Sequence, residues 1–156
     1  MRPFAPFRSA DLAALEERLF CAAERIVPMR EIAGGDTAPG AIGLRHDCDN
    51  VIEPAVAFAE WEHQRGYRST YFILHSAPYW QDKSLLRESV ERIEACGHEI
   101  GLHNDAIAQA IGTHRYPIDI LEDALDELNG YTREPVVGTV AHGNALCYGA
   151  DGKVRS

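Results

Sequence analysis

Histidine and aspartate residues gather at four points of the sequence, each at the end of a short apolar run. The segments are His46-Asp47-Cys48-Asp49-Asn50, His75-Ser76, His103-Asn104-Asp105 and His142-Gly143-Asn144. Imidazole nitrogens and carboxylate oxygens are donors that Zn²⁺ binds in proteins, and the same groups move protons in hydrolysis. If the fold brings these segments together, they indicate metal-assisted hydrolysis.

The two aspartates of the first segment carry most of this hypothesis. Asp47 and Asp49 are two residues apart, so their side chains leave on the same side if the strand continues through them. Two carboxylates on one face repel each other unless a cation or a proton lies between them. With a metal ion, one carboxylate is a ligand and the other stays free to take a proton from bound water. The alternative is a turn and helix cap, the commoner use of such a motif taken alone.

The histidines differ in their expected roles. His98 and His103 are separated by five residues of expected strand, which is roughly 16 Å, so they cannot share one ion. His103 lies at the exit edge and is the predicted ligand, whereas His98 lies at the entry edge and is expected to be structural. His142 precedes a glycine and can project into the site, although an interior histidine fits equally well.

The elements that must position these residues follow from the apolar periodicity. We predict helices over about 10–25, 54–65, 83–96 and 117–128, and strands over 41–46, 69–74, 98–103 and 136–141. Polar loop residues are expected between the third strand and the last helix. The βα units at about 41–144 require parallel strands with outer helices, as in a doubly wound sheet or a (β/α) barrel. In such folds the strand ends, and so the four segments, meet at one edge.

Length and composition bound the class of protein. A chain of 156 residues with 46% hydrophobic content fits a single domain over 1–156. A formal net charge of −9 argues against nucleic-acid or anionic-membrane partners and favours a neutral ligand or a cation. The four cysteines are far apart and are expected to be free thiols. Neither a signal-peptide h-region nor a membrane span is recognised, so we expect a cytoplasmic protein.

Three stretches resemble the polysaccharide deacetylase family, the NodB-homology fold of carbohydrate esterase family four. They are Arg45-His46-Asp47-Cys48-Asp49, Ser69-Thr70-Tyr71-Phe72-Ile73-Leu74 and Gly97-His98-Glu99-Ile100-Gly101-Leu102-His103-Asn104. The resemblance covers roughly 41–144 and is closest to a variant branch whose first motif reads His-Asp-x-Asp. It implies a partial or distorted (β/α) barrel that removes N- or O-acetyl groups from carbohydrates with a divalent metal ion, Zn²⁺ being expected.

Carried over residue by residue, the resemblance makes Asp47 the catalytic base, Asp49 a metal ligand and His103 the first ligand histidine. Ile107 stands where the family has a second histidine, four residues later. The third ligand must then come from elsewhere, with His142 as first choice and Asp105 as second.

Other site roles stay open at this point. The general acid is either His142 or His75, and one residue cannot be assumed both to bind the ion and to donate the proton. The expected substrate contacts are His75, Tyr79, Asn104 and Asp105.

The resemblance leaves three readings of the whole chain. An eight-unit barrel takes about 250 residues, whereas four units are recognised here, so a truncated or minimal barrel is expected. Ile107 favours an alternative in which the domain has lost its chemistry and binds glycans or is structural. A third reading is another metal-dependent hydrolase on the same barrel plan, because fold does not dictate reaction.

Overall fold

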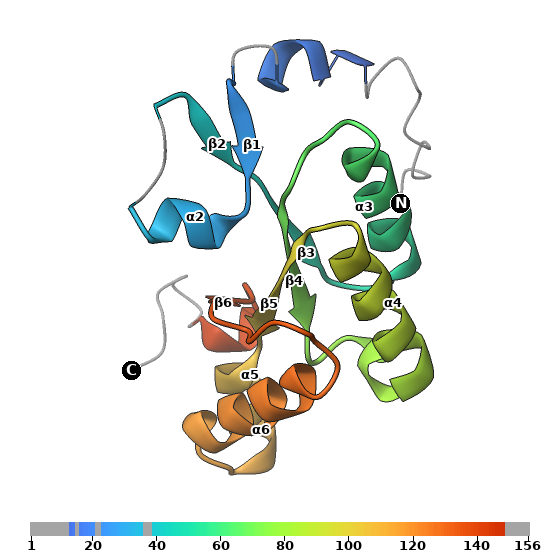
Figure 1. The fold of residues 1–156 in the computed structure, drawn as a ribbon. Coiled ribbons are helices and arrows are strands. Elements are labelled where there is room, and N and C mark those ends of the chain that lie inside the picture. Colours follow the sequence, from blue (N-terminus) through green and yellow to red (C-terminus); the bar gives the residue numbers. More distant parts are fainter. Residues whose placement is uncertain (1–12, 15, 21–22, 36–38, 149–156) are drawn as a thin grey trace, which may run out of the picture.

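The structure is a computed structural model, and it describes residues 13–14, 16–20, 23–35 and 39–148. It is a mixed α/β fold whose described strands all pair in parallel (Figure 1). One sheet has the order β1-β2 and the other has the order β3-β4-β5-β6. The described strands are β1 (Arg25–Val27), β2 (Ala41–Gly43), β3 (Arg45–Cys48), β4 (Thr70–Leu74), β5 (Glu99–Asn104) and β6 (Thr139–Ala141).

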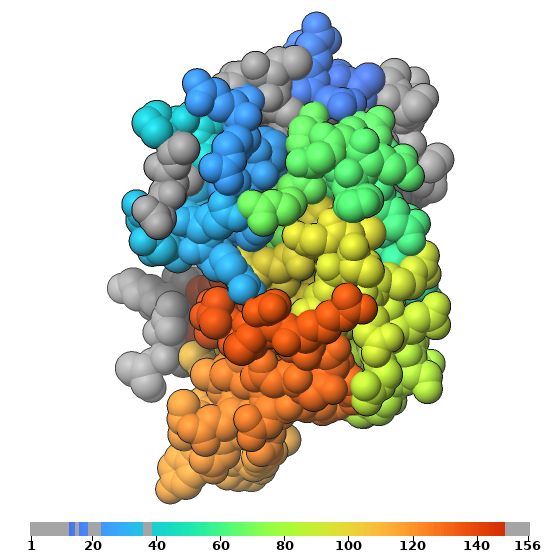
Figure 2. Space-filling view, in the orientation of Figure 1, coloured from blue at the N-terminus to red at the C-terminus, as the bar shows by residue number. Residues whose placement is uncertain are grey.

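Helices connect the strands, as parallel pairing requires. The α-helices are α2 (Met29–Ala33), α3 (Glu53–His63), α4 (Lys83–Ala95), α5 (Ala106–Thr113) and α6 (Pro117–Asn129). The shorter turns are η1 (Glu16–Phe20), η2 (Pro78–Gln81) and η3 (Ala145–Cys147). In the space-filling view, α5 and α6 form the lower end of the molecule (Figure 2).

One bent strand joins the two sheets. The Leu44 N–H donates to the Val27 carbonyl at 3.2 Å, and the Leu44 carbonyl accepts from the Thr70 N–H at 2.9 Å. The chain from 41 to 48 therefore leaves β1 and joins β4 without a connecting loop. Among the described residues, β3 and β6 are the outer strands of the four-stranded sheet.

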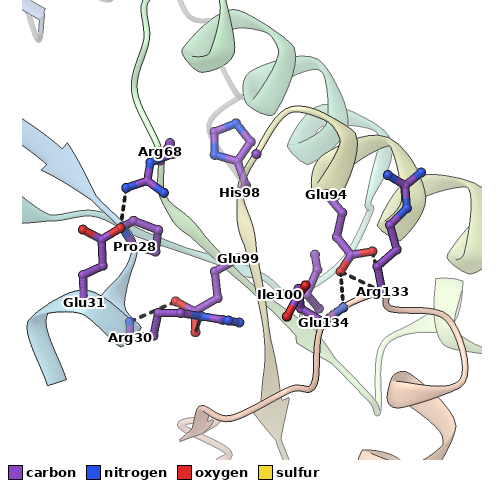
Figure 3. Close-up of a pocket in the computed structure, with 11 residues that line it drawn as sticks. Pro28, Arg30, Glu31, Arg68, Glu94, His98, Glu99, Ile100, Arg133 and Glu134 are labelled. Carbon is purple, nitrogen blue, oxygen red and sulfur yellow. Dashed lines mark hydrogen bonds and ion pairs between the residues drawn. The ribbon is translucent and has the colours of Figure 1, made fainter. Parts of the chain in front are cut away.

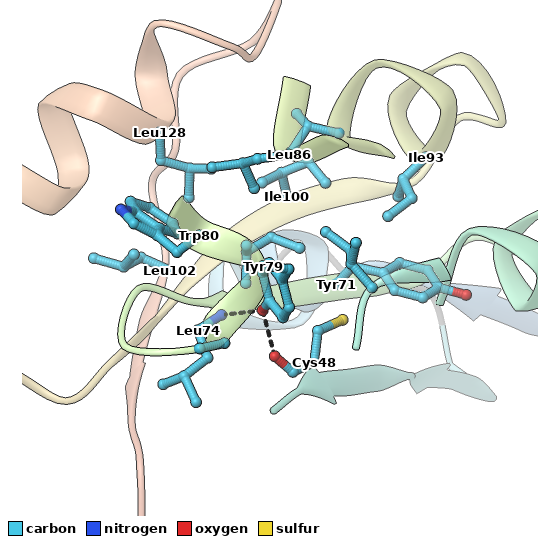
Figure 4. Packing of buried hydrophobic residues seen from close by; sticks show 14 of the residues in the cluster. Cys48, Tyr71, Leu74, Tyr79, Trp80, Leu86, Ile93, Ile100, Leu102 and Leu128 are labelled. Carbon is cyan, nitrogen blue, oxygen red and sulfur yellow. Dashed lines mark hydrogen bonds between the residues drawn. The ribbon is translucent and has the colours of Figure 1, made fainter. Parts of the chain in front are cut away.

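The hydrophobic core lies between the four-stranded sheet and its helices. Leu86 and Ile93 of α4 and Leu128 of α6 pack against strand residues such as Ile100 and Leu102 (Figure 4). Burying one such side chain stabilises the fold by about 1.5–3 kcal/mol. This packing fixes the strands, and with them the positions of the residues at their ends.

The structure agrees with most of the predicted elements and corrects three. The predicted helix over 10–25 is wrong at its C-terminal end, because Arg25 begins β1 and pairs with Ala41. The predicted polar loop after the third strand is wrong, because α5 starts at Ala106. The last strand begins at Thr139, later than predicted, because only its last three residues pair with β5.

Two further expectations concern the cysteines and the membrane. The three cysteines within the described residues, Cys48, Cys96 and Cys147, are free thiols. Cys21 lies outside the described residues. None of the described helices is long and apolar enough to cross a membrane.

Candidate metal centre

Three side chains from three strand ends converge on one point. They are Asp49 after β3, His103 in β5 and His142 after β6, and one ligand atom of each lies within 4.8 Å of the other two. The strand register explains the meeting, because Leu74 pairs with His103 and Cys48 pairs with Ile73. Asp49 is the next residue after Cys48, so it lies in the same row as Leu74 and His103.

The distances within this trio suit a small divalent ion. His103 Nε2 lies 3.3 Å from Asp49 Oδ1 and 3.3 Å from His142 Nδ1. His142 Nδ1 and Asp49 Oδ1 are 3.8 Å apart. Bonds of 2.0–2.1 Å at tetrahedral angles place the ligands of Zn²⁺ about 3.4 Å from one another. Three ligands at these spacings leave a fourth position for water or substrate.

The hydrogen bonds of His103 fix which nitrogen faces the trio. His103 Nδ1 lies 3.1 Å from the Val140 carbonyl oxygen, so this nitrogen donates its proton there. Nε2 then carries a lone pair directed at Asp49 and His142. In metal sites the ring nitrogen that does not bind the ion typically donates such a hydrogen bond, which orients the imidazole. The ring is also buried, with only 4% of the side chain exposed.

The Asp49 carboxylate provides an independent test of whether a cation fits. Its Oδ1 atom is buried and has no hydrogen-bond partner among the described residues. A buried carboxylate oxygen without a partner costs free energy, which a bound cation removes. The donor set of one carboxylate and two imidazoles is one that catalytic zinc sites use.

Asp47 lies beside the trio and is not part of it. Its Oδ2 atom is 4.0 Å from His103 Nε2, and it accepts a hydrogen bond of 2.7 Å from Arg45 Nη2. The intervening residue, Cys48, is buried in the core instead. Burial, with smaller effects of Asp47 and Asp49, raises the pKa of the Cys48 thiol to about 12, so it stays protonated.

A polar pocket of about 370 Å³ adjoins the trio. It is lined by Asp49, Asn50, Leu74, Ser76, Ala77, Pro78, Asp105, His142 and Asn144. Asp105 is buried, and its Oδ2 accepts hydrogen bonds from Ser76 Oγ at 3.0 Å and Asn144 Nδ2 at 2.9 Å. Asp105 Oδ1 has no hydrogen-bond partner among the described residues. This pocket gives a substrate a place directly beside the trio.

The structure does not bring His75 and Tyr79 to this pocket. His75 is buried, and its Nε2 accepts the Asp105 N–H at 2.7 Å. Burial lowers the pKa of His75, the charge of Asp105 opposes this with a smaller effect, and His103 adds slightly to the lowering, so the neutral ring is favoured. The Tyr79 hydroxyl donates to the Cys48 carbonyl and accepts the Leu74 N–H at 2.8 Å, which ties the ends of β3 and β4 together.

Asn104 and Ile107 lie on the other side of His142. Both line a second pocket of about 160 Å³ that His142 also borders. Asn104 Nδ2 donates to Thr139 Oγ1 at 2.8 Å. Ile107 is part of α5 and is 53% exposed. The position where polysaccharide deacetylases have a second histidine thus lies in the first turn of a helix here.

Sequence reasoning missed Arg45 and the side chains that hold Asp105. Arg45 stands two residues before Asp47 on the same strand, and this spacing could have indicated an ion pair. Ser76 and Asn144 belonged to the segments of interest, but their common contact with Asp105 depends on the tertiary fold.

A pocket of about 290 Å³ lies at the opposite edge of the sheet (Figure 3). Arg30 lies 3.0 Å from Glu99, the first residue of β5, and Arg68 pairs with Glu31. The Arg133 N–H donates to Glu94 at 3.0 Å. The Arg30–Glu99 pair ties α2 to the start of β5, four strand positions before His103, and the hydrogen bond to Glu94 ties the loop after α6 to α4.

Searches for similar proteins do not extend the family resemblance. The chain matches no family model, and no curated protein or solved structure shows significant similarity to it.

Proposed function

We propose that this protein is a metal-dependent hydrolase that removes N- or O-acetyl groups from a carbohydrate. The observation that carries the proposal is the meeting of Asp49, His103 and His142 at the spacing of zinc ligands, with Asp47 alongside. The resemblance of the His-Asp-x-Asp and Gly-His-Glu-Ile-Gly-Leu-His stretches to polysaccharide deacetylases supports it.

Asp49, His103 and His142 would hold the ion, with Zn²⁺ as first choice. When bound, a divalent ion lowers the pKa of water and polarises an acetyl carbonyl. Asp47 then takes the proton of the attacking water, since its carboxylate faces the trio without belonging to it. His142 is assigned to the ligand set, because its Nδ1 atom points at both other ligands.

The pocket beside the trio would receive the sugar. Its lining offers hydroxyl, amide and carboxylate groups from Ser76, Asn50, Asn144 and Asp105, which suit the hydroxyl groups of a carbohydrate. In this proposal the bent strand at Leu44 and the parallel order β3-β4-β5-β6 form part of a distorted (β/α) barrel wall.

Metal content and acetate release test the proposal together. The purified protein is stripped with a chelator, reloaded with Zn²⁺ and incubated with acetylated chitooligosaccharides and acetylated xylan. We expect about one ion per chain and release of acetate that the chelator abolishes. A protein that binds no divalent ion would contradict the proposal.

The second candidate is a non-catalytic domain that binds glycans. Ile107 in place of the second histidine favours it. Stoichiometric metal without acetate release, together with retention on an immobilised glycan, would support this candidate over the hydrolase.

A further inference from the structure

A glycine in β5 lets an aromatic ring lie across the sheet. A Cβ atom placed on Gly101 would be 2.4 Å from Phe72 Cε1, so no larger residue fits without moving the ring. Phe72 is paired with Gly101 in the register and is buried. The ring thus forms a fixed platform on the face of the sheet that carries Asp47.

Arg45 lies over this platform and binds Asp47. Its guanidinium carbon is 5.5 Å from the centre of the Phe72 ring, and its Nη2 atom is 2.7 Å from Asp47 Oδ2. The ring attracts the cation, and the charge-assisted hydrogen bond fixes the carboxylate. Both contacts fall on one face because Arg45 and Asp47 are two residues apart in β3.

The Asp47 carboxylate is held just outside ligand distance. Its Oδ2 atom lies 4.0 Å from His103 Nε2, compared with 3.3 Å for Asp49 Oδ1. A shift of roughly 0.6 Å toward His103 would give this pair of atoms the spacing of two tetrahedral ligands, and a larger movement is needed to reach Asp49 and His142 as well. Asp47 would then complete a four-ligand set, and a closed set of this kind leaves no position for water.

We propose that Arg45 is a positioning residue that keeps Asp47 beside the metal ion and out of its coordination shell. The inference rests on the proposed function and adds to it a reason why one carboxylate binds the ion and the other does not. Without Arg45, Asp47 becomes a fourth ligand and the site changes from a catalytic to a structural one.

Cobalt titrations of four proteins test this role. The proteins are the wild type, Arg45→Gln, Asp47→Asn and the double variant, each loaded with Co²⁺, whose visible absorption reports its ligands. In Arg45→Gln we expect the Kd for Co²⁺ to fall by about tenfold, because the loss of a nearby cation and the gain of a carboxylate ligand both favour the ion. We also expect the absorption band to change and acetate release to be lost.

The double variant separates ligation from simple charge repulsion. Removing a cation near a metal site raises affinity by itself, and this effect persists when Asp47 is replaced by asparagine. We expect the change in the absorption band to disappear in that background, and most of the affinity gain with it. The coupling between the two changes measures the ligation alone. Arg45→Lys, which keeps the cation, should retain the wild-type spectrum.

Two results would overturn the inference. An Arg45→Gln spectrum identical to that of the wild type shows that Asp47 does not enter the shell. A spectral change that persists in the Asp47→Asn background shows that a group other than Asp47 enters the coordination shell. If the wild type binds no Co²⁺, the proposed function fails as well, whereas a wild type that binds Co²⁺ and releases acetate leaves that function intact.

Discussion

The three ligand side chains differ in how deeply they are buried and in how they are hydrogen-bonded. His103 is 4% exposed and fixed by the Val140 carbonyl, whereas the side chains of Asp49 and His142 are 44% and 27% exposed. A side chain that is already oriented loses less conformational freedom when it binds an ion. We therefore expect His103 to contribute most to metal affinity.

Substitutions at the centre should separate binding from turnover. We expect Asp49→Ala and His103→Ala to abolish retention of metal through gel filtration. Asp47→Asn should retain the ion and lower kcat by about 10²- to 10⁴-fold, the usual contribution of a general base. Elemental analysis and acetate release measure the two effects. Equal metal content in the wild type and all three variants would refute this division of roles.

His98 is expected to stabilise the fold and not the centre. Its side chain is fully buried, Nδ1 accepts the Ser69 N–H at 3.1 Å, and Nε2 lies 2.9 Å from the Ala59 carbonyl oxygen. His98→Ala should lower the free energy of unfolding by about 1–3 kcal/mol, because it leaves buried polar groups without partners. The Kd for metal should not change. His63→Ala, at an exposed histidine, serves as the control; a selective loss of metal in His98→Ala would contradict the assignment.

At the scale of the element, β5 depends on the absence of a side chain at Gly101. Gly101→Ala places a methyl group against the Phe72 ring, and such overpacking costs about 1–3 kcal/mol. Gly112→Ala in α5 meets no neighbour within 4 Å and should instead stabilise the protein by about 0.5–1 kcal/mol. Urea unfolding measures both changes.

A second substitution tests the cause of that cost. In a Phe72→Ala background the ring is gone, so Gly101→Ala should cost clearly less than in the wild type. An equal cost in both backgrounds would mean that the glycine is needed for another reason, such as its backbone geometry.

The elements show what local sequence can and cannot predict. Asp49 and His103 could be placed at one edge because they end long apolar runs of parallel strands. The helix α5 was missed because its eight residues follow directly on the polar residues His103, Asn104 and Asp105, where a loop was expected. The predicted helix over 10–25 overlaps β1 at Arg25, because Ile26 continues the spacing of the preceding leucines. The three residues of β1 are a strand because they pair with β2, a long-range contact.

At the scale of the whole molecule, a buried polar cluster links stability to pH. Glu62 is buried, and its carboxylate binds His46 at 2.8 Å, Ser69 at 2.6 Å and Tyr71 at 2.8 Å. Burial opposes ionisation of Glu62, but these hydrogen bonds and the charge of His46 prevail and lower its pKa. For His98, by contrast, burial is the largest effect and lowers the pKa, against smaller effects of the Ala59 carbonyl and Glu62.

Stability should therefore fall in two steps as the protein is acidified. The unfolded chain takes up protons on histidine near pH 6.5, where folded His98 and His75 stay neutral. Below this pH each of these two histidines lowers the free energy of unfolding by at most about 1.4 kcal/mol per pH unit. Glu62 adds its stabilisation above pH 4.5, and this is lost as the pH falls through its lower folded value. Urea unfolding in chelator from about pH 8 to about pH 2.5 measures both steps.

A variant identifies the source of the first step. His98→Gln removes one of the two buried histidines whose pKa is lowered, so the slope of stability against pH between about 6.5 and 5 should fall by about half. If His98→Gln keeps the wild-type slope of stability against pH, other groups cause the acid sensitivity.

Two of the three ligands follow the strands that are outermost in the four-stranded sheet as far as the structure describes the chain, β3 and β6, and the third, His103, belongs to β5. β6 pairs with β5 through three residues. An ion bound by Asp49, His103 and His142 would link β6 to β3 across the carboxyl end of the sheet. Binding of the ion would then raise the melting temperature with metal concentration, and removal of the ion would let β6 separate from β5 first.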